Sequence, residues 1–165
     1  SDITLDYHLM VEGADQAVPL FSKIPGSFVT FHPETSHHPV RTIQKIKDDG
    51  CKPGIAIGPA TSLESVKYLL PLVDMVCIMT VNPGYSGQKL LPFCIGKMAE
   101  LNEWKQQNHP DLLIEVDGNV SWENIPKMLE AGADVLVLGT SSVFTKSMDR
   151  KEAYKKLNDL IEKSL

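Results

Sequence analysis

Short apolar runs alternate with segments of helical spacing along the whole chain, and this alternation limits the possible folds more than any other feature. The apolar runs cover residues 3–11, 27–34, 52–58, 74–81, 112–118 and 134–141. Segments with helical spacing follow them, at residues 14–24, 39–49, 62–72, 90–107, 121–132 and 149–165. Strands that alternate with helices predict a parallel sheet with helical crossover connections. We therefore expect an α/β fold.

Polar residues and glycines stand at or near the ends of these runs. They are Asp6 and His8 inside the first run, and then His32, Glu34, Asn82, Gly84, Asp117, Gly118 and residues 139–142. A parallel sheet binds its ligands at the carboxyl ends of its strands, whether the sheet is open or closed into a barrel. No glycine motif of the dinucleotide-binding type follows the first run, so that open fold has no support. The repeated polar strand ends favour a barrel.

Three strand ends in the second half of the chain carry glycine, in the segments GYSGQ, DGN and GTSS. Glycine lets the backbone approach a ligand closely, and backbone N–H groups in such turns bind anions. A tight turn explains any one of these glycines equally well. Taken together with the hydroxyls of Thr140, Ser141 and Ser142, the three segments predict a phosphate site.

Asp117 ends an apolar run, where a partly buried carboxylate needs a partner, a cation or a catalytic function. It could instead cap the next helix, but Ser121 is better placed for that. His8 lies within the first run, where a lone histidine is usually an ordinary core residue. If the fold brings these two side chains together, they suit zinc, iron or manganese. Met10 and Met79, near strand ends, are core residues or the apolar wall of a sugar site.

Composition excludes several classes of function. A net charge of −5 and a pI near 5.5 offer no basic field for nucleic acid. No apolar run reaches the length of about 18 residues expected of a membrane span. Three cysteines without metal-type spacing indicate reduced thiols. We expect a cytoplasmic protein of one domain, residues 1–165, that binds neither nucleic acid nor membrane and forms a homo-oligomer.

Several segments together resemble the ribulose-phosphate 3-epimerase family, over nearly the whole chain. They are DYHLMV, TFHPET, IMTVNPGYSGQ, EVDGN and AGADVLVLGTSSVF, in this order. The segment AELNEW and residues 115–142 are also similar to D-allulose-6-phosphate 3-epimerases. The resemblance implies a (β/α)₈ barrel that inverts carbon 3 of a ketose phosphate. D-ribulose 5-phosphate, converted to D-xylulose 5-phosphate, is the expected substrate, and allulose 6-phosphate is the alternative.

The resemblance also implies roles for single residues. In this family two aspartates move a proton and a divalent metal stabilises the enediolate. Asp117 is implied to bind the metal and act as acid/base, and His8 to bind the metal beside the substrate. Met10 and Met79 are implied to line the substrate site beside the reacting carbon. The loop NPGYSGQ is implied to close over the substrate, and the residues implied to hold its phosphate are Gly84, Ser86, Gly87, Gly118, Asn119, Gly139, Thr140 and Ser141.

The chain also departs from the family pattern. A barrel of this class usually needs about 250 residues, whereas only six strands are expected here. The first two βα units are missing, and with them a HxDxMDG motif that carries two metal ligands and the other acid/base. We expect a portion of a longer protein, from the third strand to the C-terminal helix.

A non-catalytic phosphosugar-binding protein is the alternative function. A decarboxylase or an aldolase would need a buried lysine at a strand end. Gly58 and Asn119 replace residues that are usual in the family, which leaves the sugar open.

Overall fold

The computed structural model describes residues 3–85 and 87–164. Within these ranges six strands form one sheet in the order β1-β2-β3-β4-β5-β6, with every neighbouring pair parallel. The strands are β1 (Asp6–Leu9), β2 (Phe28–Phe31), β3 (Lys52–Ile57), β4 (Met75–Met79), β5 (Leu113–Asp117) and β6 (Val135–Leu136). Each lies inside one of the predicted apolar runs, so the strand prediction is confirmed.

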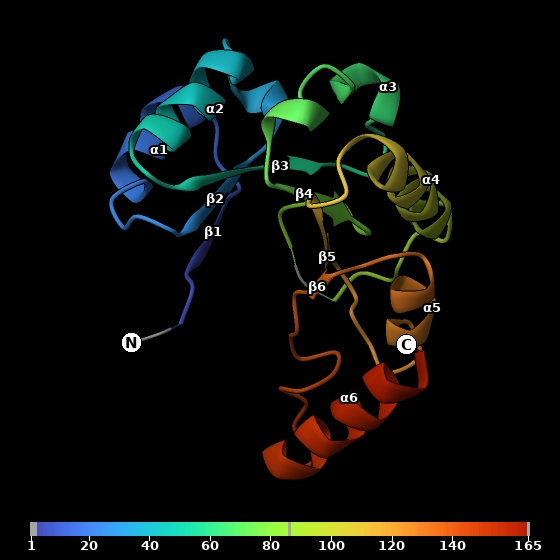
Figure 1. The fold of residues 1–165 in the computed structure, drawn as a ribbon. Helices are drawn as coiled ribbons and strands as arrows, with labels where there is room; N and C mark the ends of the chain where they lie inside the picture. The colour runs from blue at the N-terminus through green and yellow to red at the C-terminus, as the bar shows by residue number, and fades with distance from the viewer. Residues whose placement is uncertain (1–2, 86, 165) are drawn as a thin grey trace.

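Helices follow the strands and cover one side of the sheet (Figure 1). They are α1 (Ala14–Phe21), α2 (Pro39–Asp48), α3 (Leu63–Val66), α4 (Phe93–Asn108), α5 (Ile125–Glu130) and α6 (Arg150–Ser164), with short 3₁₀ helices η1 (Pro33–Thr35) and η2 (Leu70–Leu72). Two of them, α3 and α5, are much shorter than predicted. Pro71 has no N–H group, so α3 does not continue through η2. Pro126 lies in the first turn of α5, a position that favours a helix start there rather than at residue 121.

The sheet is curled into part of a barrel (Figure 1). In the part of the chain that the structure describes, β1 and β6 each pair with one neighbour, so the curl is not closed. This agrees with the prediction of a barrel that lacks its first two units. None of the described helices combines the length and the apolar character needed to cross a membrane.

The two faces of the curled sheet differ in chemistry. Side chains alternate along each strand, so every second residue points to the helices. On that side Val29, Ile55, Val76 and Ile114 are fully buried in one large core cluster, and each such side chain contributes about 1.5–3 kcal/mol by leaving water. The concave face carries a small separate cluster and polar groups, namely Ala56, Cys77, Met79, Thr30 and Glu115. Chemistry is therefore possible on the concave face.

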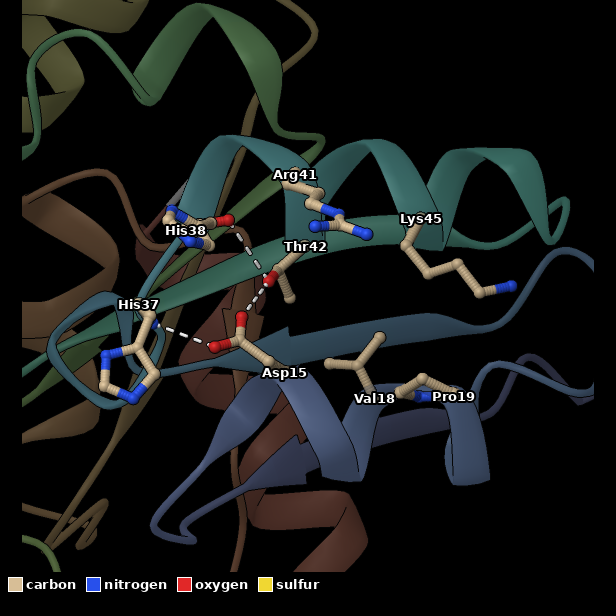
Figure 2. Close-up of a pocket in the computed structure, with 8 residues that line it drawn as sticks. All are labelled: Asp15, Val18, Pro19, His37, His38, Arg41, Thr42 and Lys45. Carbon is tan, nitrogen blue, oxygen red and sulfur yellow. Dashed lines mark hydrogen bonds between the residues drawn. The ribbon is translucent and has the colours of Figure 1, made fainter.

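A pocket of about 490 Å³ lies between α1 and α2, on the helical side of the sheet (Figure 2). Its main polar feature is Asp15, at the start of α1. The carboxylate of Asp15 accepts hydrogen bonds from the hydroxyls of Ser36 at 2.6 Å and Thr42 at 2.7 Å, and from the N–H of His37 at 2.9 Å. These bonds, that of Ser36 first, lower the pKa of Asp15 to about 2. The hydrogen bonds of Asp15 therefore connect the start of α1 to the start of α2.

Asp15→Asn should lower the free energy of unfolding by about 1 kcal/mol at pH 7, a value reduced for the partial exposure of the carboxylate. Because the pKa of Asp15 in the folded state lies below its ordinary value of 3.8, the stabilisation is complete well above pH 4 and is lost as the pH falls towards 2. Urea unfolding of wild type and variant at pH 7 and pH 3 should show a smaller difference at pH 3. Asp48→Asn, at an exposed carboxylate of α2, is the control and should change little. An equal difference at both pH values would contradict the role of Asp15.

Candidate functional site

A second pocket, of about 450 Å³, lies at the carboxyl ends of β4, β5 and β6. It gathers most of the residues that the sequence singles out. Those that line it are Met10, Met79, Gly84, Gly87, Asp117, Gly118, Asn119, Gly139, Thr140 and Ser141. Of the others, Ser86 lies outside the described residues, and His8 does not line the pocket but contacts Asp117. No lysine is among the described lining residues.

The end of β5 is fixed tightly to the end of β4. The N–H of Thr80 donates to the carbonyl of Asp117 at 2.8 Å, and the Thr80 hydroxyl donates to the carbonyl of Gly118. Gly118 has φ +118°, and a Cβ placed there would lie 2.7 Å from Cγ2 of Val81 and 2.8 Å from Oγ1 of Thr80. Glycine is therefore required at this position by both backbone conformation and space.

Asn119 joins three segments around the pocket. It is the one non-glycine residue of the described chain with a positive φ, +46°, a conformation that asparagine tolerates. Its side-chain oxygen accepts from the N–H of Leu90 at 3.3 Å and from Nδ2 of Asn124 at 3.0 Å. Asn124 Nδ2 also donates to the Asn119 carbonyl at 3.1 Å. The side chain thus connects the loop after β4 with the segment that leads into α5.

The loop after β4 begins with the Pro-Gly turn and folds back on itself. Nε2 of Gln88 donates to the carbonyls of Asn82 at 2.6 Å and Tyr85 at 3.0 Å. At its far end, the N–H of Leu91 donates to the carbonyl of Thr80 at 2.9 Å. The loop is therefore closed by its own hydrogen bonds beside the pocket.

Backbone donors remain unused around this pocket. In the described chain the N–H groups of Gly118, Asn119, Thr140 and Ser141 make no internal hydrogen bond. Backbone N–H groups are nearly always paired, so free ones at a pocket are available to an anion. The expected hydroxyl of Ser142 is not available, because this side chain is fully buried and does not line the pocket.

His8 of β1 and Asp117 of β5 meet across the concave face. Nδ1 of His8 lies 3.6 Å from Oδ2 of Asp117, and the side chains are 15% and 23% exposed. Two ligand atoms that each lie about 2.0–2.2 Å from one zinc ion are separated from each other by a distance similar to this 3.6 Å. The pair therefore fits a metal in donor type and in spacing. No group of three or more metal-binding side chains is found among the described residues. The pair can therefore supply part of a metal site.

His32 stands beside this pair, although the sequence analysis gives it no role. It is 4% exposed, and its ring stacks on that of His8 with centroids 5.2 Å apart. Its Nε2 lies 3.1 Å from Nε2 of His8, and its Nδ1 lies 3.4 Å from Oε1 of Glu34. Burial, followed by the nearby His8, lowers the pKa of His32. Its place at a strand end was a visible signal, but its contact with His8 was not.

Glu115 is a second polar residue to which the sequence analysis gave no role. It is 1% exposed, and its Oε2 has no hydrogen-bond partner in the described part of the chain. Burial first, and then the hydrogen bond and charge of Asp6, raise the pKa of Glu115 to about 8. Its position two residues before Asp117 places it on the same face of β5. The concave face therefore holds a mostly protonated carboxyl group at neutral pH.

Comparisons with known proteins agree on one family. Residues 1–144 match the ribulose-phosphate 3 epimerase family. Ribulose-phosphate 3-epimerases of Helicobacter pylori and Escherichia coli K12 are 42% and 40% identical, over 97% and 98% of this chain and 73% and 69% of theirs. One from Buchnera aphidicola of Acyrthosiphon pisum is 43% identical, over 82% of this chain and 60% of its own length. The aligned part thus covers less than two thirds of that relative.

Solved structures support the barrel class of the fold. The chain superposes on 3-hexulose-6-phosphate synthase from Salmonella typhimurium with a TM-score of 0.61 at 19% identity, over 95% of this chain and 71% of the other. For thiamine phosphate pyrophosphorylase from Pyrococcus furiosus the TM-score is 0.60 at 12% identity, over 100% and 85% of the chains. At these identities the likeness concerns the fold alone.

Proposed function

Because the chain belongs to the ribulose-phosphate 3 epimerase family, we propose that it carries the substrate site of an isomerase that inverts carbon 3 of a ketose phosphate. The main support is the pocket at the carboxyl ends of β4, β5 and β6, which joins Asp117 to glycine-rich turns with unused N–H groups. D-ribulose 5-phosphate is the first candidate substrate, because the similar proteins are named for it. D-allulose 6-phosphate is the second, because the segment AELNEW and residues 115–142 are also similar to D-allulose-6-phosphate 3-epimerases.

The proposed roles follow from what each group can do. The N–H groups of Gly118, Asn119, Thr140 and Ser141 would bind the phosphate, with Gly84, Ser86, Gly87 and Gly139 in the same turns. Met79, buried at the pocket wall, and Met10 would exclude water from the reacting carbon. Asp117 is the one carboxylate among the described lining residues, and would take up or return the proton at carbon 3.

His8 and Asp117 would also hold a divalent metal, zinc, iron or manganese. Such an ion would supply positive charge beside the oxygens of the enediolate. Inversion requires a second acid/base on the opposite face of carbon 3, and this group must come from outside the described lining residues. A phosphosugar-binding protein without catalysis is therefore the second candidate function. The single domain, the homo-oligomer and the cytoplasmic location stay predictions.

An exchange experiment separates these functions. The protein is incubated with ribulose 5-phosphate or allulose 6-phosphate in D₂O in the presence of Mn²⁺ or Zn²⁺, and the carbon-3 proton is followed by NMR. We expect exchange of this proton with one of the two sugars, and none with the same sugars lacking phosphate. If both phosphates bind without exchange, the binding function is supported instead. If neither phosphate binds, both proposals fail.

A further inference from the structure

Four side chains form a row across the concave face, in the order Glu34, His32, His8 and Asp117. The contacts that join them are 3.4 Å, 3.1 Å and 3.6 Å long. Each histidine uses one ring nitrogen for each of its neighbours. His32 presents Nδ1 to Glu34 and Nε2 to His8, while His8 presents Nε2 to His32 and Nδ1 to Asp117. The row therefore determines where the ring protons can lie.

An acceptor stands at each end of the row, and the contact of His32 with Glu34, at 3.4 Å, is shorter than that of His8 with Asp117, at 3.6 Å. The carboxylate of Glu34 can only accept, so this contact favours the tautomer of His32 that carries the proton on Nδ1. Nε2 of a neutral His32 is then an acceptor, and the proton shared over 3.1 Å belongs to Nε2 of His8. Nδ1 of His8 is left with a free lone pair facing Asp117. The carboxylate of Asp117 favours the opposite arrangement by the same rule, with the proton on Nδ1 of His8, and no lone pair would then be available there for a cation.

The local backbone holds Glu34 and His32 in this relation. His32 directly precedes η1, and its carbonyl accepts from the N–H of Thr35 at 3.0 Å and from the Thr35 hydroxyl at 2.8 Å. The short 3₁₀ turn brings Glu34 back towards the imidazole of His32. His32 itself is buried and stacked on His8, so neither ring can turn freely.

We propose that His32 and Glu34 are positioning residues that fix the tautomer of His8, so that Nδ1 of His8 and the carboxylate of Asp117 face a divalent cation together. This inference rests on the proposed function in one respect, the metal-binding role of His8 and Asp117. A metal-bound histidine commonly donates its second N–H to an acceptor, and loss of that acceptor commonly costs 10- to 100-fold in metal affinity.

The tautomers can be read directly without any activity. Long-range ¹H–¹⁵N spectra of metal-free protein, labelled with ¹⁵N-histidine and measured at pH 8, identify the protonated nitrogen of each ring. We expect His32 to carry its proton on Nδ1 and His8 on Nε2. In Glu34→Ala, we expect His32 to shift towards the commoner Nε2–H form and the His8 signals to change with it. A His32 ring protonated on Nε2 in the wild type would overturn the proposal.

Metal binding gives the second measurement. Titration of Zn²⁺ and Mn²⁺ by calorimetry should show affinity 10- to 100-fold lower for His32→Phe, which keeps a flat ring but removes the acceptor. His38→Phe, at an exposed histidine, is the control and should bind as the wild type does. Equal affinity in His32→Phe and wild type, with both folded by circular dichroism, would overturn the proposal. Absence of carbon-3 exchange in a protein with the expected tautomers and affinities would count against the proposed function alone.

Discussion

Asp117→Asn should lower the rate of carbon-3 proton exchange by about 100- to 10,000-fold, the range that a positioned acid/base contributes. The amide has the shape of the carboxylate but cannot accept the proton. The backbone at residue 117 should not move, because its carbonyl is held by the N–H of Thr80 at 2.8 Å. Exchange in D₂O is measured by NMR with the preferred sugar phosphate at saturation.

Phosphate binding is the internal check on this result. Asp117 contributes a side chain, whereas the proposed phosphate donors are backbone N–H groups, so the Kd for the sugar phosphate should change less than about tenfold if the fold is intact. Asp159→Asn, at an exposed carboxylate of α6, should exchange like the wild type. Exchange at the wild-type rate in Asp117→Asn would remove Asp117 from the acid/base role and leave it as a structural partner of His8.

The sequence predicts the sheet and most of its helices because both depend on local patterns. Apolar runs such as residues 74–81 are followed by turn residues such as Pro83 and Gly84. The spacing of apolar side chains also changes between strands and helices. Predicted helix ends were less accurate where proline intervened, at Pro71 and Pro126. Most of the residues predicted for the site line one pocket, because a parallel sheet brings the ends of its strands to one edge.

Contacts across the concave face could not be predicted in the same way. His8 lies opposite Thr30 in the register of β1 and β2. The histidine that it contacts, His32, follows Thr30 by two residues. Glu115 interacts with Asp6, which belongs to a strand that is not its neighbour in the sheet. The first contact depends on the register of two neighbouring strands and the second on the curl of the whole sheet, and no local pattern specifies either. The contact of His32 with His8 therefore became visible only in the structure.

Gly118→Ala should destabilise the protein by about 2–5 kcal/mol, the sum of a strained backbone conformation and an overpacked contact. The strain arises because φ at this position is +118°, where an alanine is unfavourable. The contact arises because the new methyl group would lie 2.7 Å from Cγ2 of Val81 and 2.8 Å from Oγ1 of Thr80. The midpoint of urea unfolding, with an unchanged m-value, measures the loss.

Gly84→Ala separates the two causes. Gly84 has nearly the same φ, +119°, but a Cβ placed there meets no atom within 4 Å. It should therefore cost only the strain, about 1–2 kcal/mol, or less if the exposed loop relaxes. The excess cost of Gly118→Ala then reports the close packing that holds the N–H groups of Gly118 and Asn119 at the pocket. Equal costs for the two variants would mean that this packing is loose, and the proposed phosphate site would lose its rigid support.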